Sequence, residues 1–155
     1  MTALLIVAHA PLASALLAAA KHVYAEKLGA VAALDIAPEQ TIEQAESSVR
    51  AALVRLAPAG SGVDTLVLVD VFGATPCRAA QAVAAESARV RLVAGVNVPM
   101  LWRALCYADD VPLDVLVERA VSGAQQGALP VATARRQNQP GRVAADDQVQ
   151  HHDQQ

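Results

Sequence analysis

The chain has 155 residues, of which 54% are hydrophobic and 3% aromatic, and its formal net charge is -3. This length and apolar content suffice for a single domain with a buried core. The negative charge and the scarcity of aromatic rings argue against a nucleic-acid-binding surface, which needs basic side chains and stacking partners. We therefore expect no nucleic-acid partner.

The amino-terminal segment is apolar enough to resemble a secretory signal. No basic residue precedes it, however, and His9 and Pro11 interrupt its apolar run. The two cysteines, Cys77 and Cys106, lie far apart without the spacing of metal ligands, and we expect reduced thiols. These features predict a cytoplasmic protein with no membrane span and no metal site.

Four short apolar runs alternate with segments of helical periodicity along the chain. Strands are expected at Leu4–Ala8, Val31–Ile36, Asp64–Val71 and Val90–Val96. The spacing predicts a first helix from Pro11 to a C-cap at Gly29, and a second from a capping box at Thr41 and Gln44 to a point before Pro58. Three further helices are predicted over Cys77–Ser87, Met100–Ala108 and Leu113–Ala124.

This alternation predicts an α/β fold with a doubly wound, mainly parallel sheet and helices on both faces. Which strands are neighbours depends on the strand order. If the order reverses beside the first strand, as in the expected order 2-1-3-4, the first and third strands are neighbours. Leu129–Ala134 is expected to add an antiparallel edge strand. The folded domain then spans residues 1–134, and residues 135–155, polar and rich in glutamine, are predicted to be a disordered tail.

Polar residues follow the strands at the edge where their carboxyl ends meet. The first strand runs into His9, and Pro11 suits the first turn of the helix that follows. Asp70 follows the third strand, and Asn97 and Pro99 form an expected supporting loop after the fourth. Open α/β sheets bind ligands at this edge, and helix amino ends there favour anions. With the predicted strand order, His9 and Asp70 meet.

These residue types indicate phosphoryl chemistry. A histidine is a useful nucleophile when one ring nitrogen is free and the other donates its proton to a fixed acceptor, which Asp70 can be. Gly73, Ala74 and Thr75 are predicted to bind phosphate through backbone N–H groups and an N-cap hydroxyl, with Pro76 at the first helical position. The motifs of nucleotide kinases, dinucleotide enzymes and metalloproteases are absent from the sequence, and no cofactor is expected.

The same edge residues are also compatible with a purely structural role, a binding module or a metal chelatase. A histidine or an aspartate after a strand is often only a turn or cap residue, and a non-catalytic binding module would use the same edge. A tetrapyrrole metal chelatase also begins with a strand that runs into Ala-His. It would need a second histidine at the edge, and the others are His22, His151 and His152.

Two loops carry a resemblance to a known family. Residues 69–76, Val-Asp-Val-Phe-Gly-Ala-Thr-Pro, and residues 94–101, Ala-Gly-Val-Asn-Val-Pro-Met-Leu, resemble the signature loops of mannose-type enzyme IIA proteins of the bacterial phosphoenolpyruvate-dependent sugar phosphotransferase system. His9 stands where the family has its phosphorylated histidine, and Asp70 matches its aspartate partner. The similarity extends over roughly residues 3–130. The family's turn usually has two glycines and a serine where this chain has Gly73, Ala74 and Thr75.

The resemblance implies a phosphotransferase. His9 would accept a phosphoryl group from the phosphocarrier HPr and pass it to an enzyme IIB (EIIB) partner, for sugar uptake or in an incomplete, regulatory phosphotransferase system. The membrane would be involved only indirectly, through transporter subunits. The resemblance and the expected edge strand both point to a homodimer.

Overall fold

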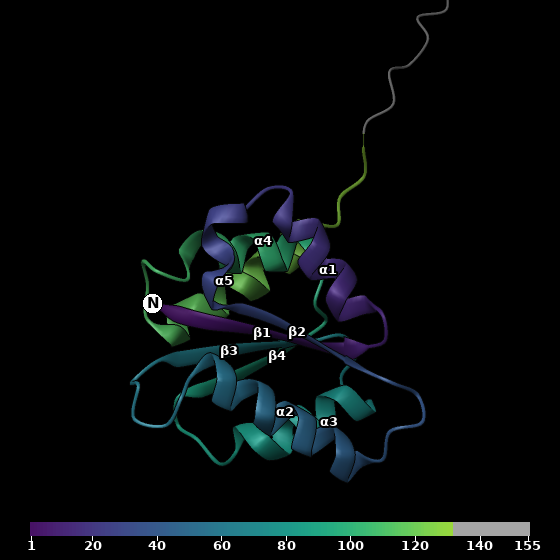
Figure 1. Cartoon of the computed structure of the whole chain (residues 1–155). Helices are drawn as coiled ribbons and strands as arrows, with labels where there is room; N and C mark the ends of the chain where they lie inside the picture. The colour runs from purple at the N-terminus through teal and green to yellow at the C-terminus, as the bar shows by residue number, and fades with distance from the viewer. Residues whose placement is uncertain (132–155) are drawn as a thin grey trace, which may run out of the picture.

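The structure is a computed structural model that describes residues 1–131, without the side chains of residues 27 and 28. Four parallel strands form one sheet in the order β2-β1-β3-β4 (Figure 1). Their bounds are Thr2–His9 (β1), Val31–Ile36 (β2), Asp64–Val69 (β3) and Val90–Ala94 (β4). The predicted fold class and strand order are confirmed. The order reverses beside β1, so the loops after β1 and β3 open next to each other.

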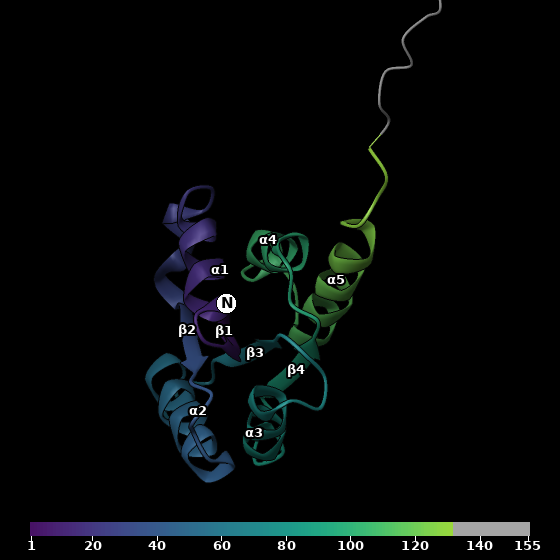
Figure 2. The same ribbon diagram turned by 90° about the vertical axis from the view of Figure 1, so that its right-hand side faces the viewer.

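Helices cover both faces of the sheet (Figure 2). On one face lie α1 (Leu12–Lys21), α4 (Val98–Tyr107) and α5 (Leu113–Gln126), with the short 3₁₀ helix η1 (Ala25–Ala30) after α1. On the other face lie α2 (Ile42–Leu56) and α3 (Thr75–Ala84). This two-sided arrangement is what right-handed crossovers between parallel strands produce.

The central strand β1 is buried on both faces. Because side chains alternate along a strand, Leu4 and Ile6 pack under α1, α4 and α5, whereas Leu5 and Val7 pack above α2 and α3. Each of these side chains is at most 1% exposed, and burying one contributes about 1.5–3 kcal/mol. The continuous apolar run that predicted a buried strand therefore anchors the residue at its carboxyl end, His9.

The predicted capping box of α2 is confirmed. The Gln44 N–H donates to Thr41 Oγ1 over 3.3 Å, and the Thr41 N–H donates to Gln44 Oε1 over 2.9 Å. Each side chain thus satisfies one backbone donor that the helix leaves unpaired.

The first helix is shorter than predicted, because it ends at Lys21 and not at Gly29. The N–H groups of Val23 and Tyr24 both donate to the carbonyl of Ala20, which closes the helix. The Tyr24 ring packs edge-on against Trp102 of α4, with 6.4 Å between ring centroids. This tertiary contact accompanies the early end of the helix, and helical periodicity alone does not reveal it.

Only part of the predicted carboxyl-terminal structure can be compared with the fold. Residues 129–131 follow α5 without strand structure. Residues 132–134 of the expected edge strand, and the predicted tail 135–155, lie outside the described residues, so the boundary at residue 134 stays a prediction. Within residues 1–131, no helix is long and apolar enough to cross a bilayer.

Candidate active site

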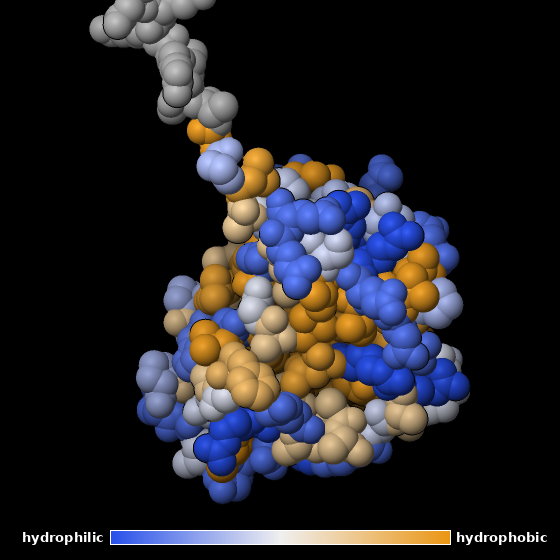
Figure 3. All heavy atoms as spheres, turned by 180° about the vertical axis from the view of Figure 1, so that it is seen from behind, coloured by the Kyte–Doolittle hydropathy of each residue, from blue (hydrophilic) through white to orange (hydrophobic). Residues whose placement is uncertain are grey.

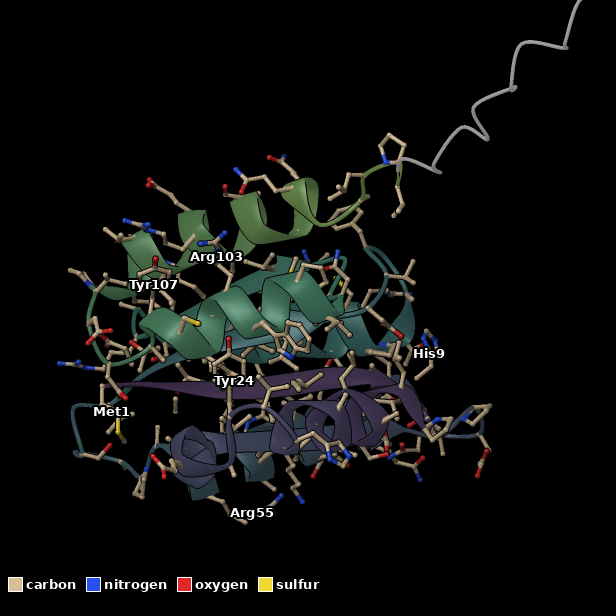
Figure 4. The ribbon with its side chains drawn as sticks, turned by 90° about the horizontal axis from the view of Figure 1, so that it is seen from above. Met1, His9, Tyr24, Arg55, Arg103 and Tyr107 are labelled. Atoms are coloured by element: carbon tan, nitrogen blue, oxygen red, sulfur yellow. The ribbon has the colours of Figure 1, made fainter. Side chains whose placement is uncertain are left out.

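His9 is the last residue of β1 and lies at the carboxyl edge of the sheet, opposite Met1 (Figure 4). The strand before it is buried, but the His9 side chain is 48% exposed. A rigid scaffold therefore presents an accessible imidazole.

Asp70 follows β3 and lies beside His9, with its side chain only 6% exposed. Its Oδ2 accepts the backbone N–H of His9 over 2.9 Å and lies 2.7 Å from His9 Nδ1. Its Oδ1 accepts the N–H of Val71 over 2.8 Å. Both carboxylate oxygens are therefore held by N–H donors, and the structure brings together the two residues that the strand order predicted to meet.

The charge state of Asp70 determines which nitrogen of His9 carries a proton. Burial raises the pKa of Asp70, but the hydrogen bonds from the His9 backbone, the His9 ring and the Val71 N–H outweigh it and hold the pKa below its ordinary value. The carboxylate is therefore ionised at neutral pH and can only accept. In the neutral imidazole, Nδ1 of His9 must then carry the proton, and Nε2 has the lone pair.

The connection from β3 to α3 is a tight turn. The Ala74 N–H donates to the Val71 carbonyl over 3.3 Å, and Gly73 has a φ of 83°. Only glycine adopts this conformation without strain. The turn exposes Phe72, which is 76% accessible.

The start of α3 differs from the prediction by one residue. Ala74 is the N-cap, Thr75 is the first helical residue, and Pro76 is the second. The reason is that the turn before the helix closes at Ala74. The Ala74 N–H donates to the Val71 carbonyl in this turn and is not free for a ligand. Among the described residues, no group accepts the N–H of Gly73 or Thr75. The first turn of α3 contains no acidic residue, so its amino end keeps its partial positive charge.

A pocket of about 220 Å³ adjoins His9 and Thr75. The other residues that line it are Ile36, Ala37, Pro38 and Gln40, from the end of β2 and the loop after it. Its volume is several times the roughly 30 Å³ that a water molecule occupies in the liquid. A tetrahedral anion therefore has room beside the imidazole.

Asn97 and Pro99 support α4 and make no hydrogen bond to His9. Asn97 caps α4 through its Oδ1, which accepts the Met100 N–H over 2.9 Å. Pro99 packs closely against Gly127 at the end of α5. A Cβ atom on residue 127 would overlap the ring of Pro99. The contact from this loop to the site comes from Gly95 instead, because its N–H donates to the Asp70 carbonyl over 3.0 Å.

A model of the family described as the PTS system fructose IIA component (EIIA-man) matches residues 3–121. The chain belongs to the mannose-type enzyme IIA family. The PTS system mannose-specific EIIAB component of Escherichia coli K12 is 35% identical over 86 residues, which are 55% of this chain and 27% of that protein. The PTS system fructose-specific EIIA component of Bacillus subtilis is 38% identical over 63 residues, 41% of this chain and 43% of that protein. The chain thus spans well under two thirds of both relatives.

Solved IIA structures share the fold. The phosphotransferase component EIIA of Streptococcus agalactiae superposes with a TM-score of 0.71 at 22% identity, covering 84% of this chain and 97% of that one. The mannose/sorbose-specific IIA subunit of Enterococcus faecalis gives 0.71 at 24% identity, covering 86% and 97%. At these identities the likeness establishes the fold alone.

Sequence reasoning missed two residues of this IIA site. Gly95 supports Asp70, and its φ of 88° explains why a glycine stands there. The available signal was a glycine inside the expected strand Val90–Val96, because glycine weakens a strand interior. The strand in fact ends before it, at Ala94. Asp35, at the end of β2, accepts the N–H of Ser14 at the start of α1, and nothing in the order of residues along the chain predicts that contact.

The IIA site, as far as residues 1–131 describe it, does not provide the second histidine that a chelatase would need. His22 is the C-cap of α1, at the opposite end of that helix from His9. His151 and His152 lie outside the described residues. Within residues 1–131, no group of three or more His, Cys, Asp or Glu side chains is placed to hold a metal ion.

The lowered pKa of Asp70 predicts an acid-sensitive fold. Because the folded pKa lies below the unfolded one, the unfolded state binds more protons at acidic pH, and the stabilisation is present above the unfolded value of about 4. It should be lost as the pH falls through the lower, folded pKa. Chemical unfolding between pH 7 and pH 2.5 should show a steeper loss for the wild type than for Asp70→Asn. Parallel curves for the two proteins would contradict this assignment.

Proposed function

We propose that this IIA protein is a phosphohistidine carrier, which accepts a phosphoryl group from HPr on Nε2 of His9 and passes it to an EIIB partner. The observation that carries the proposal is the 2.7 Å contact between His9 Nδ1 and an ionised Asp70, because it leaves Nε2 as the nucleophilic nitrogen. Membership of the mannose-type IIA family supports the same reaction class.

The transfer follows from this geometry. The lone pair of Nε2 attacks the phosphorus of the donor phosphohistidine, a new N–P bond forms, and the donor N–P bond breaks with its electron pair returning to the donor nitrogen. The proton on Nδ1 stays in place. Bonding at Nε2 gives the ring a positive charge, which the buried carboxylate of Asp70 balances.

The phosphoryl oxygens need donors next to Nε2. We assign this role to the Thr75 hydroxyl and to the N–H groups of Gly73 and Thr75, which lie at the amino end of α3 and have no acceptor within residues 1–131. Thr75 lines the same pocket as His9, and the partial charge of a helix amino end favours an anion. Ala74 contributes the turn and no N–H group.

Protein partners need a surface around His9. Val71 and Phe72, directly after Asp70, are 57% and 76% exposed, and exposed apolar groups of this kind mark contact surfaces. We assign them to transient docking of HPr and EIIB, which would place the donor or acceptor histidine over the His9 ring.

Phosphoenolpyruvate, enzyme I and HPr provide the test. Incubation of this protein with all three should add the mass of one phosphoryl group to each chain, and a purified mannose-type EIIB should then remove it. Omission of HPr is the control and should prevent labelling. An unmodified chain in the complete mixture would favour a non-catalytic binding module instead.

We further propose a homodimer built on the free edge of β4. Among the described residues, β4 pairs with β3 and has no neighbour on its other side. Figure 3, which shows the molecule from behind, displays an apolar band on the face toward which this free side points. Leu129 and Val131, which follow α5, are 67% and 85% exposed. An unpaired strand edge and exposed apolar residues after α5 each favour contact with a second chain.

Sedimentation tests the dimer. The wild type is expected to sediment as a dimer at micromolar concentration, and Val131→Asp should shift it toward the monomer by placing a charge in the interface. Val54→Asp is a matched control, because Val54 is 59% exposed but lies on α2. A monomeric wild type would refute the proposal.

A further inference from the structure

The turn after His9 is attached to the end of β2. The N–H of Ala10 donates to the Ile36 carbonyl over 3.0 Å, and the N–H of Ser14 donates to Asp35 Oδ1 over 3.1 Å. The Ser14 hydroxyl donates to the Pro11 carbonyl over 3.0 Å. The short segment between His9 and α1 therefore depends on contacts with β2 for its position.

Asp35 supplies a cap that α1 does not provide for itself. The N-cap of α1 is Pro11, whose side chain makes no capping hydrogen bond, and the first turn contains no acidic residue. The first N–H groups of a helix need acceptors from outside it. Asp35 lies opposite Ala8 in the pairing of β2 with β1, which brings its carboxylate to the amino end of α1.

Among the side chains that the structure describes, no competing partner holds the Asp35 carboxylate. Ion pairs between described residues join His9 to Asp70, Arg50 to Glu86, Arg89 to Asp64, and Arg91 to Asp114. Asp35 takes part in none of them, and its one hydrogen bond among the described residues comes from Ser14. Its contact is therefore directed at the turn that carries His9.

The two helices that begin beside His9 differ in their capping. At the amino end of α1 the Ser14 N–H is bound by Asp35, whereas α3 has no side-chain cap. The cap therefore occupies a donor at α1, while the amino end of α3 keeps donors for an anion. Any hydrogen-bond acceptor in the place of Asp35 preserves this difference.

We propose that Asp35 is a positioning residue for phosphoryl transfer at His9. It holds the turn after His9 on β2, while Asp70 holds the imidazole from β3. The consequence for transfer rests on the proposed function, but the effect on the His9 ring does not. The side chain acts as a hydrogen-bond acceptor, so an amide oxygen in the same place should preserve its role.

The experiment compares variants with and without that acceptor. Asp35→Ala and Asp35→Ser, whose hydroxyl is too short to reach Ser14, remove it. Asp35→Asn keeps it, since asparagine caps helices about as well as aspartate. Asp64→Ala is the matched control. The Asp64 carboxylate also accepts one hydrogen bond, from the Arg89 guanidinium over 3.0 Å, but it lies at the amino end of β3. The two readouts are the ¹⁵N NMR signals of the His9 ring and the rate of transfer from HPr. Both are measured at a temperature well below the thermal unfolding midpoint of each variant.

Loss of the acceptor should slow phosphoryl transfer about tenfold. This lies within the roughly 10²-fold loss of rate that a small misplacement of the reacting groups can cause. The ring signals should then show a mixture of the two tautomers. Asp35→Asn and Asp64→Ala should retain wild-type ring signals and rates. Wild-type signals and rates in the variants without the acceptor would overturn the proposal, as would an Asp35→Asn variant as slow as Asp35→Ala. If HPr does not phosphorylate even the wild type, the proposed function fails, and the ring signals still decide the role of Asp35.

Discussion

Replacement of His9 by alanine is expected to reduce phosphorylation by HPr to background. His9 combines a 48% exposed ring with a fixed acceptor on Nδ1, and alanine has no nucleophile. The fold should survive, because Asp70 keeps the backbone N–H donors of residue 9 and Val71. The measurement is incorporation of labelled phosphate from phosphoenolpyruvate, with circular dichroism to confirm folding.

His22→Ala is the control for this experiment. It removes a histidine at the far end of α1 and should leave labelling unchanged. Acid-labile phosphate on the His9→Ala variant would show that another residue accepts the phosphoryl group.

The second large effect is expected for Asp70→Asn, which should slow transfer by about 10²- to 10⁴-fold, as when the carboxylate that orients a catalytic histidine is lost. Both oxygens of Asp70 accept N–H groups, so an amide nitrogen must face one of those donors in either orientation. Facing His9, it favours the tautomer protonated on Nε2. Facing Val71, it keeps the tautomer but still removes the negative charge that balances the reacting ring.

Rapid-quench measurement of transfer from phosphorylated HPr gives this rate. Asp64→Asn serves as the control, since it neutralises a carboxylate at the opposite end of β3. Transfer by Asp70→Asn at the wild-type rate would mean that Asp70 only caps its turn.

The sheet could be predicted because its physical causes lie within short stretches of sequence. The apolar run Leu4–Ala8 is buried on both faces, as a central parallel strand requires. The meeting of His9 and Asp70 followed from the expected strand order, which relates distant segments and is not set by any one short stretch. The capping box at Thr41 needs only residues three apart, so it too could be predicted.

Most of the features that could not be predicted depend on contacts between distant segments. The end of α1 at Lys21 coincides with the packing of Tyr24 on Trp102, and the cap of α1 comes from Asp35 on another strand. The start of α3 was misplaced by one residue because Thr-Pro is a common helix start, whereas the turn before it closes at Ala74. At α1 local propensity gave way to tertiary structure, whereas the start of α3 was set by a local turn.

The site of the N–P bond tests the central claim most directly. The protein, labelled with ¹⁵N on its histidine rings and phosphorylated through HPr, can be examined by ³¹P and ¹⁵N NMR for coupling between phosphorus and nitrogen. Because Asp70 holds Nδ1 of His9, coupling is expected to Nε2 of His9. Coupling to Nδ1 of His9, or to another histidine, would contradict the account.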